Sequence, residues 1–281
     1  GSFSLDGNLG LCLESTQIAF YKENGDFLKT FSFGDNLGVL RNVRVYRKST
    51  IMGTINGSAV LASIPPSTFE GSGRFLYQRT KTLHVILCAY NPLLSSIACA
   101  CDDGSLYLAP SINLTNQAKK LQSESQTDLV AYLEWSPTGD TLICVRDNGD
   151  VYLYIQSTGE SLHSHIDALK GAMSFSFCYF NQTLYFANQR ELCSLNFARH
   201  TSQFGFTNSE IFDLVRGNVI ATIDSGVIPI ECYPLKFLAL SQDREKFAVG
   251  STDHFALLNR PPVYVPLICG LCLFSSYTVI F

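Results

Sequence analysis

The feature that most constrains the fold of this sequence is an internal repeat. Segment 85–110, VILCAYNPLLSSIACACDDGSLYLAP, aligns without gaps with segment 130–156, VAYLEWSPTGDTLICVRDNGDVYLYIQ, at an offset of 45 residues. An offset of this size is the length of one four-stranded blade in a β-propeller of the WD-repeat kind. The repeat therefore predicts that the chain folds as a series of blades.

Each copy reads as three apolar strands joined by two turns. A proline opens the first turn, and the second turn is Asp103-Gly104 in one copy and Asn148-Gly149 in the other. Asp-Gly and Asn-Gly supply the positive φ angles of a tight hairpin. The flanking Ile, Val, Leu, Tyr and Cys residues suit a pleated, half-buried surface. Each copy is therefore predicted to be a β-meander.

Further copies extend the repeat in both directions. Segment 234–259 is a third clear copy, and segment 173–197 is a weaker one. Segments 3–33 and 43–64 repeat the same order of strands and turns. Segment 115–125 has helix-favouring composition but is expected to form a polar loop between strands. The sequence thus predicts an all-β, WD40-like β-propeller over residues 1–260, with five or six blade-like units of four-stranded meanders.

The length of the chain bears on whether the ring is complete. Seven blades of this length would need more than the 281 residues present, and an open array would leave sheet edges exposed. We therefore expect an incomplete propeller from a longer protein. The alternative is a smaller ring in which the apolar tail, residues 261–281, supplies closing strands. The tail could otherwise be a non-native end, or a membrane anchor, which its prolines and polar residues disfavour.

The net charge and the placement of the cysteines indicate which partners and which cellular compartment to expect. The net charge of -4 gives no basic field, so nucleic acid is not an expected partner. Several of the ten cysteines lie inside apolar strand-like runs, where a thiol behaves as a small hydrophobe. Reduced cysteines in a cytoplasmic protein are the expectation. Trp135, the single tryptophan, is predicted to be a core wedge between blades.

No motif predicts a catalytic, cofactor-binding or metal-binding residue. Cys269 and Cys272 have the spacing of a metal knuckle but lack a second ligand pair. Cys99 and Cys101 are expected on one packed strand face. The histidines are scattered, with His163 and His165 in a polar connector. The aspartates fall in predicted hairpin turns, which select Asp for local hydrogen bonds: Asp102, Asp103, Asp147, Asp150 and Asp253.

Two segments are candidates for binding a partner. Arg41, Arg44, Arg47 and Lys48 could contact an acidic partner, although a solvated edge strand protected by charge is the favoured interpretation. Segment 64–82 reads as a long loop rich in Pro and Gly, where a rigid scaffold often places a binding site. Its candidate partner-binding residues are Phe69, Arg74, Phe75, Tyr77 and Arg79.

Three of these stretches resemble the N-terminal propeller of the ribosome-control protein family. They are AYNPLLSSIACACDDGSLYLA, LEWSPTGDTLICVRDNGDVYLY with its Trp-Ser-Pro element, and YPLKFLALSQDREKFAVGSTDHFALLN. The family provides the large subunit of a Golgi-associated guanine-nucleotide exchange complex. The resemblance covers most of the chain as far as Asn259, and no catalytic residue of the family carries over to a numbered position.

The resemblance implies a non-catalytic scaffold in vesicle traffic. Its expected partners are a second exchange-complex subunit and a Rab-type small GTPase. Its expected location is cytoplasmic, peripheral to Golgi or endosomal membranes through those partners, in retrograde endosome-to-Golgi transport. One alternative is the propeller of a vacuolar-sorting, tethering or coat subunit. An alternative of another class is a propeller hydrolase or lectin, which would need convergent carboxylates, a calcium site or an aromatic sugar platform at its channel.

Overall fold

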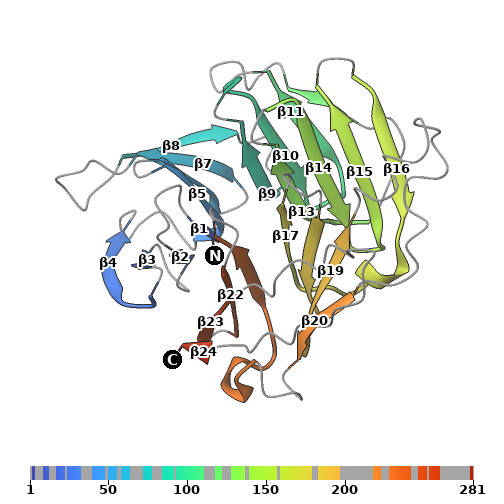
Figure 1. The fold of residues 1–281 in the computed structure, drawn as a ribbon. Helices are drawn as coiled ribbons and strands as arrows, with labels where there is room; N and C mark the ends of the chain where they lie inside the picture. The colour runs from blue at the N-terminus through green and yellow to red at the C-terminus, as the bar shows by residue number, and fades with distance from the viewer. Residues whose placement is uncertain are drawn as a thin grey trace.

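The computed structural model shows a ring of antiparallel β-sheets (Figure 1). It describes the following residues: 2–3, 9–12, 17–22, 24–32, 40–47, 50–55, 58–63, 72–77, 84–91, 93–110, 118–121, 128–136, 139–156, 159–178, 183–196, 218–222, 228–241, 246–251, 253–259 and 279–280. Within these ranges the strands form six sheets of four strands each, numbered here 1 to 6 in chain order. The all-β, WD40-like architecture of four-stranded meanders is therefore confirmed.

The strands of each sheet are consecutive in the sequence and pair in sequence order. Sheet 1 contains β1 (Ser2–Phe3), β2 (Leu9–Cys12), β3 (Gln17–Tyr21) and β4 (Phe27–Ser32). Sheet 2 contains β5 (Leu40–Arg47), β6 (Thr50–Ile55), β7 (Ser58–Ser63) and β8 (Ser72–Tyr77). Sheet 3 contains β9 (Val85–Tyr90), β10 (Ile97–Cys101), β11 (Leu106–Ala109) and β12 (Lys119–Lys120).

The second half of the chain repeats this plan. Sheet 4 contains β13 (Val130–Trp135), β14 (Thr141–Arg146), β15 (Asp150–Ile155) and β16 (Ser161–His165). Sheet 5 contains β17 (Ser174–Cys178), β18 (Thr183–Ala187), β19 (Glu191–Asn196) and β20 (Asn218–Thr222). Sheet 6 contains β21 (Phe237–Leu240), β22 (Lys246–Gly250), β23 (Phe255–Asn259) and β24 (Val279–Ile280). Two 3-10 turns, η2 (Asp167–Leu169) and η3 (Ile230–Cys232), lie between sheets.

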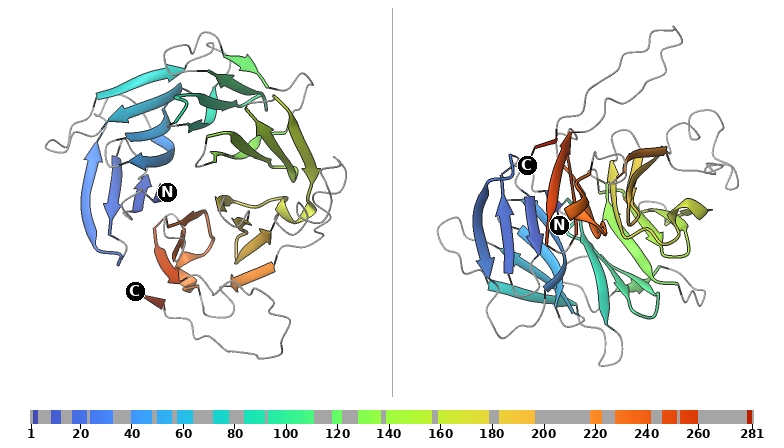
Figure 2. Two further views of the ribbon diagram at one scale, coloured as in Figure 1. Left: turned by 45° about the horizontal axis from the view of Figure 1, so that its top comes forward. Right: turned by 90° about the horizontal axis from the view of Figure 1, so that it is seen from below.

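The first strand of every sheet is its inner strand. Each inner strand lies against the inner strands of the two neighbouring sheets, and β1 lies against β21. The sheets therefore surround a common axis, as Figure 2 shows. Sheet 1 also packs on sheet 6 through Leu9, which shares an apolar cluster with Ala248 and Leu257, and through the edge-to-face rings of Tyr21 and Phe255, 5.0 Å apart. The first and last sheets are thus in contact.

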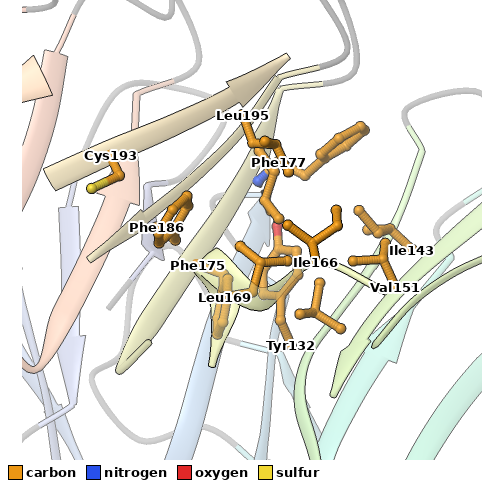
Figure 3. Packing of buried hydrophobic residues seen from close by; sticks show 12 residues of the cluster. Tyr132, Ile143, Val151, Ile166, Leu169, Phe175, Phe177, Phe186, Cys193 and Leu195 are labelled. Carbon is orange, nitrogen blue, oxygen red and sulfur yellow. Dashed lines mark hydrogen bonds between the residues drawn. The ribbon is translucent and has the colours of Figure 1, made fainter. Parts of the chain in front are cut away.

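The apolar core is divided among the junctions between neighbouring sheets. Figure 3 shows the cluster between sheets 4 and 5, where Ile143 and Val151 face Phe175 and Phe186. Because a middle strand is covered on both faces, it need not alternate apolar and polar residues. Every residue of β10 and of β18 is buried accordingly. This explains why the sequence repeat shows continuous apolar runs.

The predicted hairpin turns have the expected backbone. Gly104 and Gly149 have φ angles of 79° and 95°, in the left-handed region that favours glycine. A Cβ atom on Gly149 would lie 2.5 Å from the carbonyl oxygen of Ile166, so this position also needs glycine for space. The predicted positions of these two hairpin turns are therefore confirmed, but only the glycine of each pair has a positive φ angle.

Two segments expected to be loops contain outer strands instead. Ser72–Tyr77, inside the predicted loop 64–82, forms β8 and pairs with β7. Lys119–Lys120 forms β12 and pairs with β11. An outer strand completes the hydrogen bonds of an existing sheet edge, so it needs little apolar patterning of its own. That is why the sequence alone did not predict either strand.

The structure describes one short segment of the apolar tail, residues 261–281. Val279–Ile280 forms β24, which pairs with β23 at Leu257 and Leu258. Otherwise residues 261–281 lie outside the described part of the chain, and so does the Cys269/Cys272 pair. The division of the chain into blades and tail stays a prediction.

Candidate functional site

The partner-binding residues predicted from the sequence do not share one loop. Arg74, Phe75 and Tyr77 belong to β8, the outer strand of sheet 2. Phe69 and Arg79 lie outside the described residues. The prediction of a single long loop is therefore wrong for Ser72–Tyr77, while the assignment of these five residues to partner binding stays a prediction.

A polar network joins three of the inner strands. Arg44 on β5 donates to the Glu134 carboxylate on β13 at 3.0 Å, and its guanidinium lies 4.9 Å from the ring centroid of Tyr132. The Tyr132 hydroxyl also donates to Glu134. The same hydroxyl accepts the backbone N–H of Phe177 on β17 at 2.7 Å. Sheets 2, 4 and 5 are thus linked near the axis through one carboxylate.

Burial and ion pairing shift the pKa of the Glu134 carboxylate in opposite directions. Burial raises the pKa of Glu134, and the Arg44 charge opposes that shift. β5 is an edge strand of sheet 2, as predicted, but its residue Arg44 is ion-paired with Glu134 and is not simply solvated. A basic side chain predicted to repel other edges instead neutralises a carboxylate on another sheet.

The described inner strands contain a single acidic residue, Glu134. Glycoside hydrolysis uses a pair of carboxylates around the scissile bond, and the Glu134 carboxylate is bound by Arg44 and Tyr132. The described inner strands therefore hold no second carboxylate beside Glu134, and the Glu134 carboxylate links side chains of different sheets.

The predicted aspartate turns have structural roles. Asp103 accepts the N–H of Ser105 at 3.0 Å within its own turn. Asp102 accepts the N–H of His84 at 3.1 Å, which ties the turn to the preceding connector. Among the described residues, no three His, Cys, Asp or Glu side chains are placed to hold a metal ion. Asp103 therefore acts through a local hydrogen bond, as predicted, whereas the bond of Asp102 spans 18 residues. Asp150 lies in β15 and not in a turn.

The histidine pair expected in a polar connector lies in β16, the outer strand of sheet 4. The Asp150 carboxylate lies 2.8 Å from Nδ1 of His165 and 3.2 Å from Nε2 of His163. The other ring nitrogen of His165 lies 3.3 Å from Asp167, which also binds Lys170 at 2.6 Å. Two histidines two residues apart share a face of a strand, a spacing that could have revealed this cluster.

Hydrogen bonding shifts the pKa values of His165 and Asp150. The hydrogen bond to Asp150 raises the pKa of His165 above its usual value. Partial burial raises the pKa of Asp150, but the hydrogen bonds from His165, Asn148 and His163 outweigh it and lower the pKa overall. The folded chain binds the His165 proton more tightly than the unfolded chain, so protonation of His165 stabilises the fold. This stabilisation is complete at pH values below the pKa of His165 in the unfolded chain. It is lost as the pH rises through the folded pKa.

We expect an NMR titration of the histidine ring protons to give His165 a pKa above that of an unstructured histidine, which is about 6.5. In Asp150→Asn the His165 pKa should return toward that value, because the carboxylate charge is gone. His254→Gln, which removes an exposed histidine of another sheet, serves as an assignment control. An unchanged His165 pKa in Asp150→Asn would contradict the arrangement.

The buried thiols are packing residues. Cys99 and Cys101 share one cluster at the junction of sheets 2 and 3, as predicted. Burial raises the pKa of Cys88 and of Cys144 to about 12. A thiol with so high a pKa carries little thiolate at neutral pH and is a poor nucleophile. Trp135 is likewise buried, with its indole N–H 3.3 Å from the carbonyl oxygen of Ala89 on sheet 3, which confirms it as a wedge between sheets.

The described residues include no helix of sufficient length and apolarity to cross a membrane. No protein-family model and no curated protein matches the sequence.

Comparison with solved structures identifies the architecture. A WD40 propeller chain in the crystal structure of the mitotic checkpoint complex aligns with a TM-score of 0.53 and 12% identity. The alignment covers 92% of this chain and 72% of that chain. In all, 1525 chains of solved structures match, so the similarity reflects a widespread fold. At such low identity it establishes the β-propeller-like fold alone.

Proposed function

We propose that this chain is a non-catalytic scaffold that binds other proteins. The observation that carries the proposal is the state of its inner strands: the Glu134 carboxylate, the single acid among the described inner strands, is bound to Arg44 and Tyr132. This network links sheets 2, 4 and 5 through their inner strands. A partner can reach the rims and the outer strands, and rigid scaffolds commonly bind through their connecting segments.

The finer proposal is a subunit of a Golgi-associated Rab guanine-nucleotide exchange complex. Its partners would be a second subunit and a Rab-type small GTPase, and it would act in the cytoplasm at Golgi or endosomal membranes in retrograde transport. The three stretches that support the resemblance correspond to the inner and middle strands of sheets 3, 4 and 6. A vacuolar-sorting, tethering or coat subunit is the alternative within the same class.

The test is affinity capture of partners from cell extract with the corresponding full-length protein, followed by mass spectrometry, with and without guanine nucleotide. A stoichiometric second subunit together with a nucleotide-free Rab-type GTPase would support the exchange-complex proposal. A tethering complex, or partners that include no GTPase in either condition, would reject that finer proposal and leave the scaffold. Recovery of no specific protein at all would reject the scaffold.

A further inference from the structure

One rim of the ring gathers the connectors between sheets. Since consecutive strands in a sheet are antiparallel, the turn between the second and third strands lies at the same end as the connector that leads into the first strand. Backbone hydrogen bonds join these elements: Asp102 N to His84 O at 2.9 Å, and Asp147 N to Leu129 O at 2.9 Å. We call this end the connector rim, and the other end the opposite rim.

Large apolar side chains are exposed on the connector rim of sheets 4 to 6. Leu129 precedes β13 and is 39% exposed, and Met173 precedes β17 and is 49% exposed. Ile230 and Tyr233, in the connector to sheet 6, are 64% and 43% exposed. Of the large apolar side chains that are exposed among the described residues, these four lie on the connector rim, and four lie elsewhere: Phe27, Leu28, Leu93 and Leu94. Exposed apolar surface of this kind commonly takes part in an interaction.

The connector that carries Ile230 and Tyr233 is fixed to the ring. Its residues Ile228, Cys232 and Leu235 are buried in the apolar cluster between sheets 5 and 6, so they anchor the connector to the ring. The N–H of Leu235 donates to the carbonyl oxygen of Gln189 at 3.0 Å, which belongs to the turn of sheet 5. The fold therefore presents Ile230 and Tyr233 outward on a rigid base, which lowers the entropic cost of binding.

The same turn of sheet 5 also contacts the ring of Tyr233. The guanidinium of Arg190 lies 5.1 Å from the Tyr233 ring centroid. The hydroxyl of Ser251 in the turn of sheet 6 donates to the carbonyl oxygen of Glu231 at 3.3 Å. Turns of both flanking sheets thus hold this connector in place.

Among the described residues, the connector rim of sheets 3 to 6 carries a net negative charge. Asp102 and Asp103 in sheet 3 lie beside Asp128 in the next connector, because Arg146 donates to the carbonyl oxygens of both Gly104 and Asp128. Acidic residues outnumber basic ones in the described turns and connectors of sheets 3 to 6. The acidic residues are Asp102, Asp103, Asp128, Asp147, Asp167, Glu231 and Asp253, and the basic residues are Lys170, Arg190 and Lys236. The outer strand β12 adds two basic residues, Lys119 and Lys120.

We propose that the connector rim of sheets 3 to 6 binds a segment of a partner protein in which basic side chains flank apolar ones. The exposed apolar residues supply contact area, and the acidic residues favour a partner of positive charge. This inference rests on the proposed scaffold function and assigns it a surface.

Short fluorescent peptides test the proposal directly. One set carries Lys and Arg beside Leu and Phe, a second set has Glu in place of Lys and Arg, and a third has Ser in place of Leu and Phe. Binding to the whole chain is measured by fluorescence anisotropy at about 0.05 M and about 0.5 M salt, because screening weakens contacts between exposed charges. We expect the first set to bind best, and less tightly at the higher salt concentration.

Three double variants locate the binding surface. Ile230→Ser with Tyr233→Ser removes apolar anchors, and Asp102→Asn with Asp147→Asn removes charge but retains side-chain oxygens. Each pair should weaken binding of the first peptide set by about tenfold. Leu93→Ser with Leu94→Ser removes two exposed leucines in the turn between β9 and β10, on the opposite rim, and should leave binding unchanged.

The inference is overturned if the first peptide set does not bind below about 1 mM. It is also overturned if acidic peptides bind equally well, or if the rim variants and the opposite-rim control bind alike. Such a result, obtained while affinity capture still recovers a specific partner, rejects the assigned surface and retains the scaffold. If affinity capture with the wild-type chain recovers no partner, the scaffold function itself fails.

Discussion

Replacing Phe247 by alanine should lower the free energy of unfolding by about 4 kcal/mol, because the change removes a large buried side chain and leaves a cavity. Phe247 lies on β22 and is 0% exposed. Its ring packs edge to face on Tyr185 of sheet 5, with centroids 4.8 Å apart. The side chain therefore contributes to the junction between two sheets, and urea unfolding followed by circular dichroism measures its loss.

The matched control is Phe247→Leu, which keeps most of the apolar volume and should cost less than about 1.5 kcal/mol. A Phe247→Ala protein that unfolds at the same urea concentration as Phe247→Leu would show that the cavity refills. The cluster between sheets 5 and 6 would then not depend on this ring for its packing.

Replacing Arg146 by methionine should lower the free energy of unfolding by about 3 kcal/mol, because buried carbonyl groups lose a charged donor. Arg146 ends β14 and is 0% exposed. It donates to the Gly104 carbonyl oxygen of sheet 3 at 3.0 Å, and also to the carbonyl oxygen of Asp128. The methionine side chain keeps much of the apolar stem, so the measured loss reports on the hydrogen bonds.

The control for this change is Arg190→Met, at an exposed arginine whose contact with Tyr233 should contribute about 1 kcal/mol or less. Differential scanning calorimetry of both variants measures the contrast. If Arg146→Met and Arg190→Met lower the melting temperature equally, the hydrogen bonds of Arg146 do not stabilise the junction of sheets 3 and 4.

The exposed rim and the buried Arg146 belong to the same part of the molecule. Arg146 holds the turn that contains Asp103 and Gly104 next to the connector that contains Asp128 and Leu129. An Arg146→Met protein that remains folded should therefore also present the acidic part of the connector rim less rigidly. Peptide binding and stability are consequently linked at this residue.

The sequence alone determined the repeating local structure. Asp-Gly and Asn-Gly pairs impose hairpin turns through their own backbone angles, and apolar runs such as Ile97–Cys101 define strands that are covered on both sides. These signals are local, and their spacing gave the meander and the propeller class. Packing of Trp135 between sheets followed from the same pattern.

Only the tertiary structure decided which distant side chains meet. Arg44 and Glu134 are 90 residues apart and belong to different sheets, so no local pattern pairs them. Outer strands such as β8 form because the edge of a sheet offers unpaired backbone hydrogen-bonding groups. Such a strand can therefore form with little alternation of apolar and polar residues. The exposure of Ile230 and Tyr233, apolar residues that a sequence would assign to the core, depends on which side of their connector sheets 5 and 6 cover.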